Sequence, residues 1–71
     1  MDIAIKQSYL AQAEEHVAQG EKHIARQRGI IAQIERRGDD SQRARELLRL
    51  FEDTQKLHIA DRDRLRQELG Y

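Results

Sequence analysis

Apolar residues recur at every seventh position through the first half of the chain. Ile3, Leu10, Val17, Ile24 and Ile31 occupy the same position of five consecutive heptads. A seven-residue apolar repeat draws one stripe along an α-helix and is typical of helices that pack lengthwise against a partner helix. The repeat therefore predicts a long helix with one buried face.

The only cluster of turn-forming residues lies at positions 38–41. Gly38 can adopt the left-handed conformation that ends a helix, and Asp39, Asp40 and Ser41 can each cap the helix that follows. We predict a first helix over residues 3–37, a turn at 38–41 and a second helix over 41–69, with Asp40 as its N-cap. Because so short a turn makes long helices run antiparallel, residues 1–71 are expected to form a single all-α domain, a coiled-coil-like helical hairpin.

The second helix has a less regular apolar stripe. Its best heptad alignment places Ala44, Phe51, His58 and Leu65 in one column and Leu47, Thr54, Asp61 and Glu68 in the other. If the chain folds back symmetrically about its turn, two residues face each other when their residue numbers add up to about 78. This register places His58 in the space beside Gly20 and Ala13 opposite Leu65.

A lone hairpin of this size buries only one stripe of each helix. Ordering some sixty residues costs about 1.5 kcal/mol each in conformational entropy, and burial of apolar surface stabilises the fold by only about 25 cal/mol per Å². The apolar area buried along the single contact line between the two helices, which we call the seam, is too small to offset this cost. One flank of the hairpin carries further apolar and aromatic side chains, namely Tyr9, His16, His23, Ile30, Leu50, Leu57 and Tyr71. We predict that two hairpins associate through this flank into a two-fold symmetric, antiparallel four-helix bundle. A rival contact surface is the alanine column on the opposite flank, made of Ala4, Ala11, Ala18, Ala25 and Ala32.

Three histidines are the candidates for site chemistry. His16 and His23 are seven residues apart, about 10 Å along a helix, and the metal-binding Glu-x-x-His spacing is absent. The sequence therefore predicts no metal and no cofactor, and a transition-metal ion would need His23 and His58 to converge, with or without His16. The alternatives are that His58 only fills space in the seam, or that the histidines make a pH-responsive contact.

Composition and charge exclude several classes of function. The 13 basic and 13 acidic residues cancel, and the arginines near the turn (Arg36, Arg37, Arg43 and Arg45) lie among Asp39, Asp40 and Glu46, which argues against nucleic-acid binding. The chain has no cysteine, no Gly-rich phosphate loop and no serine with an arranged base, so we expect no enzymatic activity. No apolar run is long enough for a membrane span and no secretion signal is seen, which predicts a cytoplasmic protein without membrane association.

The segment His16–Gln27, together with Leu57, His58 and residues 61–66, resembles a group of short uncharacterised helical-hairpin proteins of alpha-proteobacteria. The similarity runs from about Tyr9 to Leu69. The resemblance implies a free-standing bacterial small protein rather than a fragment, and it carries no activity or site residue with it.

From these features we expect a non-enzymatic, self-associating interaction or regulatory module, a homodimer that could also bind an unidentified protein partner. One alternative is a histidine-based metal- or pH-responsive module. Another is a small nucleic-acid-associated regulator that uses the arginines near the turn.

Overall fold

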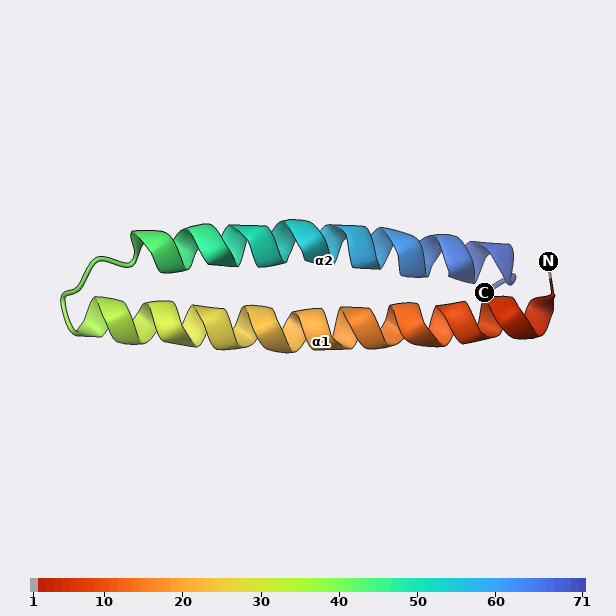
Figure 1. Cartoon of the computed structure of the whole chain (residues 1–71), viewed down its shortest axis with the longest axis horizontal. Helices are drawn as coiled ribbons and strands as arrows, with labels where there is room; N and C mark the ends of the chain where they lie inside the picture. The colour runs from red at the N-terminus through yellow and green to blue at the C-terminus, as the bar shows by residue number, and fades with distance from the viewer. Residues whose placement is uncertain (1) are drawn as a thin grey trace.

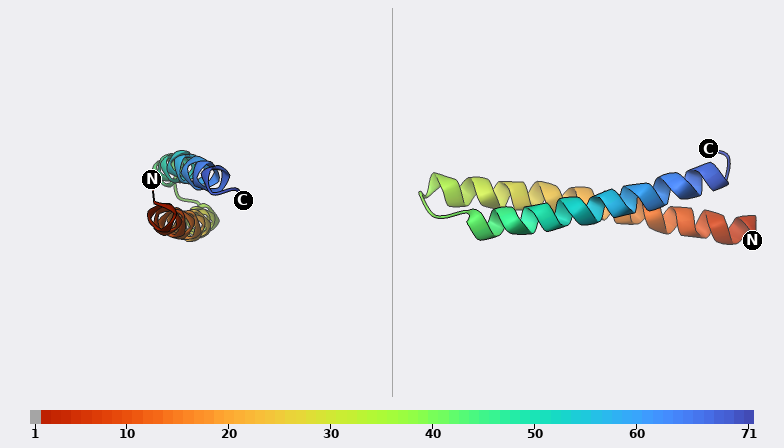
Figure 2. Two further views of the ribbon diagram at one scale, coloured as in Figure 1. Left: turned by 90° about the vertical axis from the view of Figure 1, so that its right-hand side faces the viewer. Right: turned by 90° about the horizontal axis from the view of Figure 1, so that it is seen from above.

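The computed structural model describes residues 2–71 and consists of two helices joined by a short connection (Figure 1). Helix α1 spans Ile3–Arg36 and helix α2 spans Gln42–Glu68. They run antiparallel, cross at a shallow angle (Figure 2) and form a rod of 54 × 15 × 14 Å, with both termini at the same end. The predicted all-α helical hairpin is confirmed.

Both helices end in the same backbone motif. Gly38 and Gly70 have φ angles of 77° and 84°, in the left-handed region that glycine enters without strain. After α1, the N–H of Asp39 donates to the carbonyl of Ile34, and after α2 the N–H of Tyr71 donates to the carbonyl of Arg66. These bonds are the long bonds of Schellman motifs, so each glycine stops its helix as expected.

The start of α2 differs by one residue from the prediction. Ser41, not Asp40, is the N-cap residue, although the Oδ1 of Asp40 accepts a hydrogen bond of 2.9 Å from the N–H of Gln42. The Ser41 hydroxyl instead donates to Glu35 of α1 at 2.8 Å and accepts a bond from Arg45 at 3.1 Å. Ser41 therefore ties the connection to both helices.

The buried face of α1 follows the predicted heptads. The buried residues of this helix are Leu10, Ala13, Val17, Gln27 and Ile31. Leu10, Val17 and Ile31 belong to the predicted apolar repeat, and Ala13 and Gln27 each lie three residues after one of its members. Near the open end of the rod, Leu10 and Ala13 form one buried cluster with Leu65 of α2.

One of the two predicted columns of α2 is wrong. The column of Ala44, Phe51, His58 and Leu65 lies in the seam, but Leu47, Thr54, Asp61 and Glu68 are exposed. The second column of the seam is Leu48, Gln55, Arg62 and Leu69, which are buried or half-buried. With this column in the seam, the carboxylates of Asp61 and Glu68 stay in water. The buried amide of Gln55 can be hydrogen-bonded, and the apolar part of the Arg62 side chain can cover the seam while its guanidinium stays in solvent.

The register is displaced by about one helical turn from the predicted one. His16 lies beside His58, and Lys6 pairs with Glu68 at 3.4 Å. The displacement arises because the connection runs back along the rod before α2 begins, so that α1 extends past the start of α2 (Figure 1). A symmetric fold about the turn, on which the predicted register rested, does not occur.

Two amide side chains fix this register from opposite sides. The Nε2 of Gln27 on α1 donates to the carbonyl of Ala44 on α2, and the Nε2 of Gln55 on α2 donates to the carbonyl of Val17 on α1, both at 2.9 Å. We call this pair the register bonds. Gln27 and Gln55 are 6% and 7% exposed, so a helix that slid past its partner would leave two buried amides without partners.

Gln55 also occupies the space beside Gly20. A Cβ atom added at Gly20 would lie 1.8 Å from the Oε1 of Gln55, so only glycine lets this amide approach the backbone of α1. The prediction that His58 fills this space is wrong, because the displaced register brings Gln55 to Gly20 instead.

Candidate interaction surface

The large apolar side chains that remain exposed are concentrated on one flank of the hairpin. Beside the seam, Tyr9 and Ile30 on α1 are 47% and 36% exposed, while Leu50 and Leu57 on α2 are 62% and 72% exposed. We call this surface the histidine flank, because His16 and His23 lie on the same side of α1. Four of the seven residues predicted for self-association are therefore exposed large hydrophobic groups on this flank.

Helix α2 carries a second apolar stripe on the histidine flank. Leu47, Leu50, Thr54 and Leu57 recur at intervals of three and four residues, which places them along one side of the helix. Thr54 lines the same hollow as His16 and His23, so this stripe faces the flank on which those histidines lie. Leu47 was assigned to the seam in the sequence analysis, but it is 41% exposed and extends this stripe. The signal that could have found it is its spacing to Leu50 and Leu57.

Aromatic rings line the hollow between the helices on this flank. The rings of His16 and His58 have their centroids 5.1 Å apart with a tilt of 46°, and those of His23 and Phe51 are 5.9 Å apart with a tilt of 52°. His23, whose convergence with His58 a metal site was expected to require, has Phe51 as its ring partner. Each histidine of α1 has one ring partner on α2.

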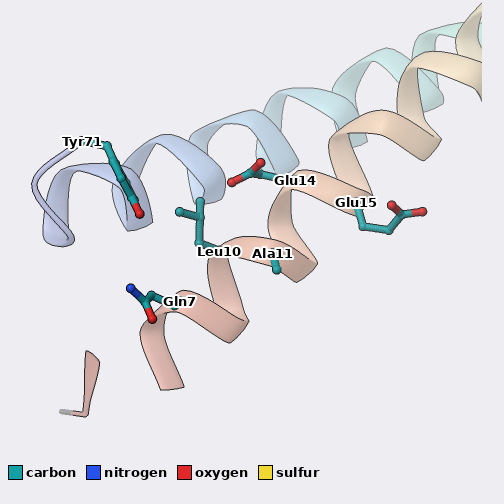
Figure 3. A pocket seen from close by; sticks show the side chains of 6 residues that line it. All are labelled: Gln7, Leu10, Ala11, Glu14, Glu15 and Tyr71. Atoms are coloured by element: carbon teal, nitrogen blue, oxygen red, sulfur yellow. The ribbon is translucent and has the colours of Figure 1, made fainter. Parts of the chain in front are cut away.

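Tyr71 does not lie on the histidine flank. It covers a hollow on the other side of α1, together with Leu10 and Glu14, as Figure 3 shows. Tyr9 lines a different hollow, with His16 and Asp61. The prediction that Tyr71 shares a flank with Tyr9 is wrong, because the chain turns at the left-handed Gly70 and brings Tyr71 beside Leu10 and Glu14.

The opposite flank is spanned by ion pairs. Arg28 and Glu52 approach to 3.3 Å, and Glu35 pairs with Arg45 as well as with the hydroxyl of Ser41. The bonds from Arg45 and then Ser41 lower the pKa of the Glu35 carboxyl below its ordinary value of 4.5. The alanine column borders this flank, and Ala4, Ala11, Ala18, Ala25 and Ala32 are all exposed.

The arginines near the connection do not form a purely basic surface. Arg45 is paired with Glu35, and the Nε of Arg36 donates to the carbonyl of Ala32. Asp39 and Asp40 lie in the connection itself, so acidic groups are interspersed with the cations as the sequence predicts.

Residues 2–71 contain neither a three-residue metal-binding cluster nor a membrane-spanning helix. Over this range no three side chains of His, Cys, Asp or Glu come together as a metal-binding group would. Neither α1 nor α2, which make up the helical part of that range, is long and apolar enough to cross a membrane.

No protein-family model, no curated protein and no solved structure matches this chain. The resemblance to alpha-proteobacterial hairpin proteins therefore stays a prediction.

Proposed function

We propose that this chain is a non-enzymatic interaction or regulatory module that pairs with a second copy of itself through the histidine flank. Two hairpins joined in this way form an antiparallel four-helix bundle with two-fold symmetry. The observation that carries the proposal is the stripe of Leu47, Leu50 and Leu57 on α2, whose members are 41%, 62% and 72% exposed.

The accessible surface of the hairpin is larger than that of a compact monomer. Its area is 5538 Å² for a chain of 8.4 kDa. The usual scaling with mass gives about 4,600 Å² for a compact monomer of this size, which leaves an excess of about 900 Å². One partner in a stable protein–protein interface buries about 800 Å². The excess surface of the rod is thus enough for one interface.

The core of the hairpin is small for an independent domain. Its buried hydrophobic residues are Leu10, Ala13, Val17, Ile31 and Leu65, and no side chain among residues 2–71 is below 2% exposure. Domains below about 70–80 residues generally need disulfides, metals or oligomerisation to supplement their cores. A second copy would bury the leucine stripe and supply that missing apolar contact.

Two ion pairs that join the helices, Arg28–Glu52 and Glu35–Arg45, lie on the flank opposite the histidines, whereas the pair of Arg64 and Asp61 on the histidine flank lies within α2. The ion pairs Arg28–Glu52 and Glu35–Arg45 would have to be desolvated if two copies met on the opposite flank. On the histidine flank, a lengthwise row of leucines can pack against the same row of an antiparallel copy. Because the stripe is straight and follows the rod, it fits another rod better than it fits a globular partner.

The oligomeric state in solution tests this proposal. Sedimentation equilibrium of the wild type at micromolar concentration is expected to give twice the chain mass of 8.4 kDa. Leu57→Arg should give the monomer mass, because it places a charge in the apolar contact, whereas Ala18→Arg is the matched control on the other flank and should remain dimeric. Circular dichroism would verify that both variants stay helical. A folded wild type of 8.4 kDa, or dissociation by Ala18→Arg alone, would contradict the proposal.

The nucleic-acid alternative has less support. The formal net charge is zero and Arg45 is paired with Glu35, so the electrostatic attraction to phosphates that dominates such binding is weak. The histidine-based alternative is favoured by the distance of 5.1 Å between the ring centroids of His16 and His58.

A further inference from the structure

Helices α1 and α2 each contribute one histidine to a close pair on the histidine flank. His16 and His58 are 42 residues apart in sequence, yet their ring centroids are 5.1 Å apart. The rings are tilted by 46°, so they are not stacked face to face. This pair was not the one expected from the sequence, which pointed to His23 and His58.

The separation of the two rings suits shared coordination of one metal ion. Imidazole nitrogens bind zinc at about 2.0–2.1 Å, and two imidazoles on one tetrahedral ion have their ring centroids about 5 Å apart. The observed 5.1 Å therefore needs little movement of either helix, because rotation of the side chains can turn a nitrogen of each ring toward a common point. His16 is exposed and His58 half-buried, so an ion can reach the pair from solvent.

We propose that His16 and His58 form a two-histidine site for a late first-row divalent cation such as Ni²⁺ or Zn²⁺. Imidazole is a favoured ligand of these ions. Within the part of the chain described here no group of three ligating side chains occurs, so water completes the coordination sphere. The site lies within one chain and does not depend on the pairing of two copies.

Such an ion would cross-link α1 and α2 through their histidines. In the unfolded chain the two histidines are far apart, whereas the folded hairpin presents them together, so the ion binds the folded state and stabilises it by mass action. His23 serves as the matched control, because it lies on the same flank but has Phe51 as its ring partner at 5.9 Å.

Isothermal titration of the untagged chain with NiCl₂ tests the site directly. We expect one ion per chain, a loss of affinity of about tenfold or more in His16→Gln and in His58→Gln, and a change within about twofold in His23→Gln. A thermal melt at tenfold excess of Ni²⁺ over Kd should show a Tm rise of roughly 6–11 °C that EDTA reverses.

Repeating the titration with Leu57→Arg separates this site from self-association. The monomeric variant should still bind one Ni²⁺ per chain, because both ligands come from the same hairpin. If the wild type gave no binding heat, or if His16→Gln and His58→Gln gave the same binding heat as the wild type, the pair would be only a ring contact. Binding that is lost in Leu57→Arg while its helical circular dichroism is retained would likewise overturn a site within one chain.

Discussion

Replacing Gly20 with alanine would place a methyl group where the amide of Gln55 now lies. The new Cβ would be 1.8 Å from Oε1 and 2.6 Å from Cδ of Gln55, far inside van der Waals contact. The side chain of Gln55 must then leave the seam and give up its hydrogen bond to the carbonyl of Val17. One of the two register bonds would be lost.

The expected free-energy change combines opposing contributions. Alanine is favoured over glycine inside a helix by about 1 kcal/mol. Against this stand the lost hydrogen bond, about 0.5–1.5 kcal/mol, and the repacking of an overfilled site, about 1–3 kcal/mol. Gly29→Ala is the matched control, because a Cβ there meets no atom within 4 Å and receives the full gain in helix propensity. We therefore expect Gly20→Ala to be less stable than Gly29→Ala by at least about 1 kcal/mol, which corresponds to a Tm about 4–8 °C lower.

Thermal unfolding followed by circular dichroism at one fixed chain concentration provides the assay. Gln55→Ala and the double variant Gly20→Ala/Gln55→Ala complete a double-mutant cycle. Once Gln55 is truncated, Gly20→Ala should become stabilising, because the methyl group then enters vacated space. If Gly20→Ala raised Tm as much as Gly29→Ala, or if the cycle showed no coupling energy, the placement of Gln55 against Gly20 would be refuted.

Two further substitutions test the core and the ion pairs. Leu65→Ala removes a side chain that is 4% exposed and packed on Leu10 and Ala13, so it should lower the free energy of unfolding by about 2–4 kcal/mol in urea titrations. Leu57→Ala should change the free energy of unfolding of the dilute monomer by less than about 0.5 kcal/mol. Equal effects of the two substitutions would contradict the assignment of Leu65 to the core. The hydrogen bonds of Glu35 to Arg45 and Ser41 lower the pKa of its carboxyl below 4.5 in the folded chain. The contribution of Glu35 to folding stability is therefore fully present above about pH 4.5, and it is lost as the pH falls through the pKa of the folded state. The urea midpoint should therefore fall less steeply below pH 4.5 in Glu35→Gln than in the wild type, and identical pH profiles would show that these bonds do not persist in solution.

The main features of the fold could be predicted because they depend on local signals. The heptad repeat from Leu10 to Ile31 identified the buried face of α1, and Gly38 identified its end, since a glycine after basic residues is a strong stop signal. Tyr9, His16, His23, Ile30, Leu50 and Leu57 were also placed on one flank by periodicity alone. Of the residues predicted for that flank, Tyr71 lies elsewhere, because the sequence does not say which way the chain turns after Gly70.

The register and the second column of α2 could not be predicted from periodicity. Leu47 and Leu48 are equally apolar neighbours, so the heptad pattern does not decide which of them faces α1. The decision depends on long-range contacts, namely the fit of Gln55 against Gly20 and the cost of burying Asp61 in the seam. For the same reason the contact of His16 with His58 became visible only in three dimensions.

The register bonds also bear on how the molecule would respond to a mechanical load. In some switching proteins one structural element ratchets past another by about one helical turn. In this hairpin that motion would rupture the amide contacts of Gln27 and Gln55 together, and it would drag the carboxamide of Gln55 out of a recess that only a residue without a side chain provides. The molecule is therefore suited to hold a fixed spacing between whatever is attached at its two ends, as a strut does, and ill-suited to serve as a sliding relay.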